Sequence, residues 1–217
     1  MTEIEWGTAI DPSPMLAFVV HTLDDRKRRL FGCACCRRVW GELTDARSRA
    51  AVEAAERYAE GELTESELEV AANEADSAWS MTEFDPAIDG LYSYAAAAYN
   101  VAIDHGRWGE TSALEPPEGI IREASPDPSA ESVAQCELLR DIFNPFWMGV
   151  RHEAWLTETV LGLARNIATL GTFERLPVLA DALEDAGCDD AELLDHCRST
   201  APHVRGCWVI DLILARQ

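Results

Sequence analysis

Cysteine and histidine side chains gather near the C-terminus of this chain. Three of its seven cysteines and two of its five histidines fall within the twenty positions 188–207. Thiolates and imidazoles are the side chains that bind zinc and related transition metals. The residues concerned are Cys188, His196, Cys197, His203 and Cys207. This clustering raises the hypothesis of a metal site.

The spacing selects four of these residues. His203 and Cys207 are four positions apart, which would place both on one face of a helix, and Cys188 and Cys197 come from the preceding helical hairpin. His196 is expected to point elsewhere. A zinc site would then use Cys188, Cys197, His203 and Cys207. No Cys-x-x-Cys knuckle is present, and a chain this long folds without metal. The sequence therefore favours a protein without a cofactor, in which Cys197 and Cys207 are core residues and His203 caps the last helix. A zinc site is the alternative.

A second cysteine group lies in a basic segment near the N-terminus. Cys33 and Cys36 share a helix face, and with Cys35 they could form half of a metal site or a redox group. Residues 30–36 are apolar all round a helix, which favours a buried central helix with packed thiols. Residues 26–40 also hold six of the eighteen basic side chains, and we expect these to pair with the chain's own carboxylates.

Recognised catalytic motifs are missing. The chain has no G-x-S-x-G elbow, no P-loop and no G-x-G-x-x-G turn. His152-Glu153 begins like a zinc-protease helix, but Leu156 stands where the second histidine would be. The acidic turn at 184–190 lacks the spacing of a calcium loop. We identify no catalytic residue, which favours a protein without enzymatic activity but leaves the question open.

Helical patterns must position these groups. Thr64 and Glu67 form a capping box, and Gly171 and Gly187 follow helical stretches as stop signals. No segment shows the alternation of a strand. The sequence predicts an all-α protein, a single-domain orthogonal bundle of about eight or nine helices. Proline and glycine divide it into an N-terminal helical half (1–103), a loop (104–128) and a C-terminal half (129–217) that packs on the first.

The composition limits the classes of partner that the protein is expected to bind. Thirty-nine acidic against eighteen basic residues give a formal charge of −21, which repels nucleic acid and anionic lipid and favours basic protein partners. The apolar runs are too short to cross a membrane, and the first residues lack a signal-peptide pattern. The sequence therefore predicts a cytoplasmic protein with seven free or metal-bound cysteines and no disulfides.

Two motifs carry a resemblance to a known family. The string Leu30-Phe-Gly-Cys-Ala-Cys-Cys-Arg-Arg-Val-Trp40 and the stretch from Leu179 through His196-Cys-Arg to Cys207-Trp208 resemble an uncharacterised paralogous family abundant in planctomycete bacteria. Residues 179–189 are also similar to the planctomycete repeat-companion domain, a helical hairpin found beside repeat proteins, with Ala182 in place of its tryptophan. The resemblance implies no known activity, and the hairpin implies an interaction role.

These observations lead to one main function and two alternatives. The main prediction is an acidic interaction or regulatory protein that meets a protein partner. The first alternative is a zinc-binding protein that uses the C-terminal cysteines and histidine. The second is a thiol redox sensor at Cys33, Cys35 and Cys36.

Overall fold

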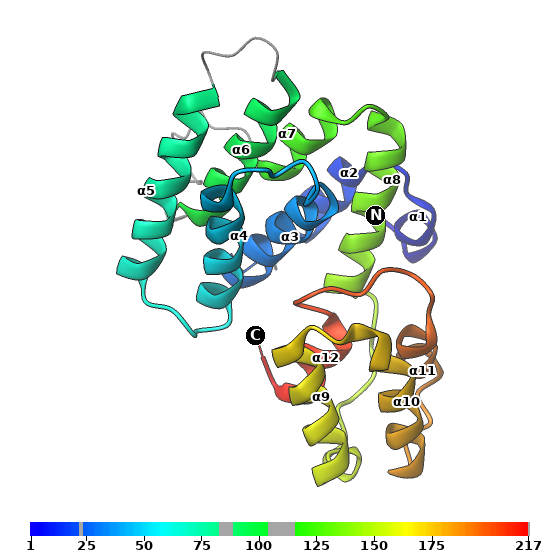
Figure 1. Ribbon diagram of the computed structural model, residues 1–217. Coiled ribbons are helices and arrows are strands. Elements are labelled where there is room, and N and C mark those ends of the chain that lie inside the picture. The colour runs from blue at the N-terminus through cyan, green and yellow to red at the C-terminus, as the bar shows by residue number, and fades with distance from the viewer. Residues whose placement is uncertain (22–23, 83–88, 104–115, 217) are drawn as a thin grey trace. The chain divides into compact units, whose positions relative to one another are not determined.

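The described part of the chain is entirely helical. The computed structural model describes residues 1–21, 24–82, 89–103 and 116–216, and these contain α-helices and short 3₁₀ helices but no strand (Figure 1). The prediction of an all-α protein is confirmed. The predicted count of eight or nine is too low, since twelve α-helices lie in the described ranges. Two short helices were missed, α1 (Glu3–Thr8) and α7 (Pro117–Ala124).

The chain forms two compact units rather than one domain. The N-terminal unit comprises residues 9–136, and the C-terminal unit comprises residues 1–8 and 137–217. Part of the predicted loop, residues 104–115, lies outside the described residues. Of the remainder, residues 117–124 form α7 rather than loop, because Pro117 stands in the first turn, where its fixed φ and missing N–H suit a helix.

The N-terminal unit is built around α3 (Asp25–Arg38). This helix packs against α4 (Ala46–Ala59), α6 (Asp89–Ala102) and α7, while α5 (Glu65–Thr82) lies beside α4 and α6 (Figure 1). The short helix α2 (Pro12–Val19) precedes α3. The Asp24 side chain caps α3, and residues 29–36 are buried without a break. This matches the buried central helix expected from an apolar stretch with no polar face.

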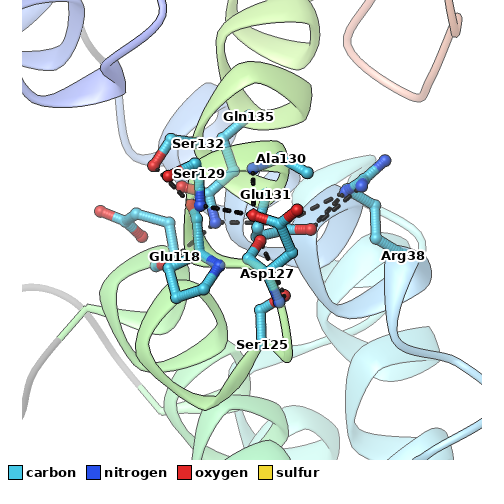
Figure 2. Close-up of polar contacts among 10 residues, drawn as sticks. Arg38, Glu118, Ser125, Asp127, Ser129, Ala130, Glu131, Ser132 and Gln135 are labelled. Atoms are coloured by element: carbon cyan, nitrogen blue, oxygen red, sulfur yellow. Dashed lines mark hydrogen bonds and ion pairs between the residues drawn. The ribbon is translucent and has the colours of Figure 1, made fainter.

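Polar contacts fix the start of α8 (Pro128–Ile142) within the N-terminal unit (Figure 2). The Asp127 carboxylate accepts hydrogen bonds from two backbone N–H groups in the first turn of α8. Glu131 accepts from Arg38 of α3 at 3.0–3.1 Å, and the Gln135 amide donates to the Glu118 carbonyl of α7 at 2.9 Å. These contacts join α3, α7 and α8.

The C-terminal unit contains the remaining helices: η3 (Glu153–Trp155), α9 (Glu158–Leu170), η4 (Phe173–Arg175), α10 (Leu176–Asp185), α11 (Ala191–Arg198) and α12 (Trp208–Leu214). Helix α9 packs on α10 and α12, and α10 packs on α11. Thr157 caps α9, and Gly171 ends it in the left-handed region at φ 67°. A hydrophobic core of leucine, isoleucine, valine and tryptophan side chains holds these helices together.

Helix α1 belongs to the C-terminal unit although it begins the chain. The Arg140 guanidinium on α8 donates two hydrogen bonds of 3.0 Å to the carbonyl of Trp6. The Trp6 ring meets Phe146 edge to face, with ring centroids 6.4 Å apart. None of the helices in the described ranges is long and apolar enough to cross a membrane.

Candidate metal centre

Four donor side chains converge in the C-terminal unit. Asp141, His196, His203 and Cys207 each offer one ligand atom, and these atoms lie within 4.8 Å of one another. They form the one such group found within the described residues. The group combines a thiol, two imidazoles and a carboxyl, which is a donor set suited to zinc and other transition metals.

Each donor comes from a different structural element. Asp141 lies in the last turn of α8, and His196 lies in the last turn of α11. His203 lies in the loop after α11, and Cys207 is the residue that precedes the first turn of α12. The loop turns at Gly206, whose φ of 90° favours glycine. The chain therefore folds back so that residues 203 and 207 meet α8 and α11.

Asp141 is the centre of the group. Its Oδ1 atom lies 2.6 Å from His203 Nδ1 and 3.1 Å from His196 Nε2. Its Oδ2 atom accepts a 2.8 Å hydrogen bond from the backbone N–H of Val204. His196 Nε2 also lies 3.3 Å from Cys207 Sγ. The four side chains thus contact one another without an intervening residue.

The distances are close to those of a filled site. Tetrahedral zinc with Zn–N of about 2.0–2.1 Å and Zn–S of about 2.3 Å separates its ligand atoms by roughly 3.3–3.6 Å. The spacings of 3.1 and 3.3 Å around His196 lie near that range, and the 2.6 Å spacing between His203 and Asp141 is shorter. The remaining donor atoms lie within 4.8 Å of one another, so a tetrahedral site requires side-chain shifts of about 1 Å.

Burial of the four side chains affects the pKa values of the ionisable groups among them. The side chains of Asp141 and His203 are 3% and 7% exposed, and that of His196 is 16% exposed. Burial acts to raise the pKa of Asp141, but the hydrogen bonds from His196 and His203 outweigh it and leave the pKa lowered. Burial also raises the pKa of the Cys207 thiol, and the Asp141 carboxylate adds to that increase. A bound cation would offset both the buried carboxylate and a thiolate.

One imidazole nitrogen of the group lacks a hydrogen-bond partner. His203 Nε2 is buried and has no hydrogen-bond partner among the described residues. Buried polar nitrogens are nearly always paired, so a lone one calls for a further group such as an ion or water. This nitrogen is not the one that faces Asp141, so it calls for a polar group beside the cluster rather than for the ion itself.

The structure changes the predicted ligand set. His203 and Cys207 do come together, but from a turn rather than from one helix face, so that premise was wrong. The expectation that His196 points elsewhere was also wrong, because α11 ends at Arg198 and the chain then turns back past its last turn. His203 does not cap α12, since Cys207 occupies the cap position.

Cys188 and Cys197 lie outside the four-residue group. Both belong to the hydrophobic core of the C-terminal unit and are 4% and 0% exposed. Burial raises the pKa of Cys197 to about 12, and the pKa of Cys188 is raised for the same reason. These two thiols therefore behave as small core side chains.

Asp141 was missed, although the sequence contains a sign of it. It lies in the segment Leu138-Leu-Arg-Asp-Ile-Phe143, in which the other residues except the arginine are apolar. It follows Leu138 by three positions and is therefore on the same helix face. Leu138 is 2% exposed and Asp141 is 3% exposed. An acid on the buried face of an amphipathic helix indicates a buried carboxylate that needs a partner.

Within the described residues, the N-terminal cysteines are not part of a comparable group of donors. Cys33, Cys35 and Cys36 are at most 1% exposed in the core of the N-terminal unit. Burial raises the pKa of all three thiols, so they stay protonated. Among the described residues, their one side-chain hydrogen bond is a long contact of 3.8 Å from Cys33 Sγ to the Val52 carbonyl. These properties are those of packed thiols.

Of the six basic residues around these cysteines, three pair with carboxylates of the chain, so the prediction of internal pairing holds in part. Arg26 pairs at 2.9 Å with Glu60, which directly follows α4. Arg37 pairs with Glu56 at 2.7 Å, and Arg38 pairs with Glu131 at 3.0 Å. The acidic turn at 184–190 is also used locally. Glu184 binds Arg198, and Asp190 caps α11 and accepts from the Trp147 indole.

Comparison of the chain with protein-family models, with curated proteins and with solved structures finds no match.

Proposed function

We propose that the C-terminal unit is a zinc-binding module whose ligands are Asp141, His196, His203 and Cys207. The observation that carries this proposal is the convergence of four buried donors from separate segments to within 4.8 Å. Thiolate and imidazole ligands favour zinc over magnesium or calcium, which prefer oxygen ligands alone. This is the zinc-binding alternative of the sequence analysis with two of its four ligands replaced.

The proposed role of the metal is structural. Four protein ligands complete a tetrahedral zinc site and leave no position for water, which is the pattern of structural rather than catalytic zinc. The ligands lie in α8, in α11 and directly before α12, so one ion would tie three helices of the unit together. The low exposure of Asp141, His203 and Cys207 supports the same role.

Elemental analysis of the full chain, purified without a tag or chelator, tests the proposal. We expect about one zinc per chain, because a tight structural site stays filled during purification. Cys207→Ala and His203→Ala should each reduce the content below about 0.1 per chain. Cys188→Ala is the matched control for the cysteine, and His152→Ala, at an exposed histidine, is the control for the imidazole. Both controls should keep their zinc.

Two results would contradict this function. The first is a wild-type chain that holds less than about 0.1 zinc after expression and refolding with added zinc. The second is loss of zinc from Cys188→Ala together with its retention in Cys207→Ala, which would exclude the proposed ligand set and also the set predicted from the sequence, because Cys207 belongs to both.

A second proposed function is binding of a basic protein partner, as the sequence analysis predicted. The charge of −21 supports it, and so does a short exposed apolar stretch in which Met148 is 89% and Val150 is 65% exposed. A pull-down from native lysate with the full chain should recover a basic partner, and binding should weaken with added salt. Recovery of no partner at moderate salt would count against it.

The redox-sensor alternative receives no support, since buried thiols with raised pKa values react poorly. A cytoplasmic location remains part of the proposal and is supported by seven unpaired cysteines. We also propose that the chain belongs to the planctomycete family and that its helices cross orthogonally. Both proposals rest on the motifs around Cys33 and Cys207 and on the helical pattern.

A further inference from the structure

An apolar pocket in the N-terminal unit is separate from the proposed metal centre. It has a volume of about 460 Å³, which is within the usual range for small-molecule sites. Helices α2, α3, α6 and α7 contribute its lining. The apolar part is formed mainly by Leu16, Ala17, Val20, Phe31, Val101 and Pro117. A pocket of this composition suits the hydrocarbon part of a ligand.

The charged side chains of this pocket are unusual for so acidic a chain. They are Arg28, Arg29 and Glu118, so two positive charges and one negative give a lining of +1 in a protein of −21. Burial raises the pKa of Glu118, which makes this carboxyl a weak competitor for the neighbouring guanidinium groups. The pocket therefore favours an anion over a cation.

Arg29 is already used by the fold. Its guanidinium donates to the carbonyl oxygens of Val101 and Ile103 at 2.5 and 3.1 Å. It also lies over the Tyr58 ring, 5.0 Å from the centroid. Arg29 therefore supports the pocket wall and contributes its charge, but its donors are directed into the protein.

Arg28 has donors to spare. Within the described ranges its side chain forms no hydrogen bond or ion pair, and its Nε atom is buried without an acceptor. Of the six basic residues in the segment at 26–38, Arg26, Arg37 and Arg38 pair with carboxylates. A buried guanidinium nitrogen without an acceptor costs free energy, and a ligand oxygen would remove that cost.

We propose that this pocket binds a small monocarboxylate with an apolar chain, whose carboxylate accepts hydrogen bonds from Arg28 while the chain lies against Leu16, Val20 and Phe31. Guanidinium and carboxylate form charge-assisted, often bidentate hydrogen bonds, which give the head group its specificity. A neutral ligand would offer Nε at most an uncharged acceptor and a weaker hydrogen bond, and a cationic one would be repelled by both arginines. This inference does not depend on the zinc proposal, because the pocket and the metal centre lie in different units.

Isothermal titration of the full chain with decanoate tests this proposal. We expect one saturable site in the wild type. Arg28→Gln should weaken binding by about tenfold or more, as expected for a lost hydrogen bond to a charged group. Arg57→Gln is the matched control, because Arg57 is exposed in the same unit and its nearest carboxylate is 3.8 Å away. This control should bind decanoate as the wild type does.

Two further arms separate the head group from the chain. Decan-1-ol has the same hydrocarbon chain without the charge, and decyltrimethylammonium reverses the charge; both should bind about tenfold more weakly than decanoate or worse. Ala17→Trp should block all binding by filling the pocket while Arg28 is kept. Circular dichroism of each variant shows whether it folds. If Arg28→Gln does not fold, Ala17→Trp still tests whether decanoate binds in this pocket.

The proposal is overturned by any of three results. These are a wild type without saturable binding, a decanol affinity equal to that of decanoate, and a folded Arg28→Gln variant with unchanged affinity. The second and third would leave an apolar pocket without anion recognition.

Discussion

The two cysteine groups of this protein have opposite outcomes. The N-terminal group is denser, with three thiols in the four positions 33–36, yet its side chains are packed in an apolar core. The C-terminal group is sparser, and only Cys207 among its three cysteines joins a cluster of donors. What separates the two groups is the presence of imidazole and carboxyl partners.

This difference shows what a cysteine count leaves out. A buried thiol surrounded by apolar atoms keeps its proton, as the raised pKa values of Cys33, Cys35 and Cys36 indicate. A buried thiol beside histidine and aspartate can exchange that proton for a metal ion. The composition of the surrounding side chains, rather than the spacing of the cysteines, defines the candidate site.

The largest predicted effect is at Asp141. Asp141→Ala removes the acceptor of both imidazoles and of the Val204 N–H. We expect the free energy of unfolding to fall by about 3–5 kcal/mol, as when one member of a buried charged group is removed. Urea denaturation with and without chelator measures it. Asp195→Ala, at an exposed acid on α11, is the control and should change stability by less than about 0.5 kcal/mol.

A pair of helix glycines makes the same comparison through packing. A Cβ atom at Gly32 of α3 would lie 2.9 Å from Val101 Cγ1, so Gly32→Ala should destabilise by about 1–3 kcal/mol. Gly162 of α9 has open space at the same position, so Gly162→Ala should stabilise by up to about 1 kcal/mol. Thermal denaturation of both variants would contradict this comparison if the two shifts had the same sign.

Helix caps give a smaller test. Asp190 accepts from the Leu193 N–H at the start of α11 and from the Trp147 indole, whereas Asp24 caps α3 through Lys27 N. Asp24→Ala should cost about 1 kcal/mol and Asp190→Ala about 2 kcal/mol. Because α11 carries His196, only Asp190→Ala should also weaken zinc binding. A chelator competition assay measures that effect, and equal zinc affinities in the two variants would argue against it.

The smallest effect on zinc binding is expected in the N-terminal cysteine group. Cys33→Ala removes one long sulfur contact to the Val52 carbonyl and a small buried volume, for about 1 kcal/mol. Its zinc content should equal that of the wild type, in contrast to Cys207→Ala. A drop in metal content would mean that the N-terminal thiols take part in metal binding after all.

Local signals explain the parts of the fold that the sequence predicted. Thr157 and Gly171 bound α9, Gly187 follows α10 at φ 87°, and the Thr64–Glu67 capping box forms as expected. Each of these depends on contacts within a few residues. Helices α1 and α7 were missed because six or eight residues carry little periodic pattern.

The candidate site was only half predicted because it depends on long-range contacts. His203 and Cys207 were identified by residue type, but Asp141 is 62 positions away from His203 and carries no motif. The position of His196 depends on the turn that follows α11, which local propensity does not specify. Residue type therefore indicated the region, and the path of the chain determined the members.

The placement of α1 has a consequence for how the chain folds during synthesis. Its six residues are synthesised before residues 9–136, but their partners, Arg140 and Phe146, are made more than 130 residues later. At roughly 5–20 residues per second, Trp6 waits for several seconds or more while residues 9–136 are completed. Fusion of a bulky tag at the N-terminus would hinder this late docking step, whereas a C-terminal tag would leave α1 free to find its place.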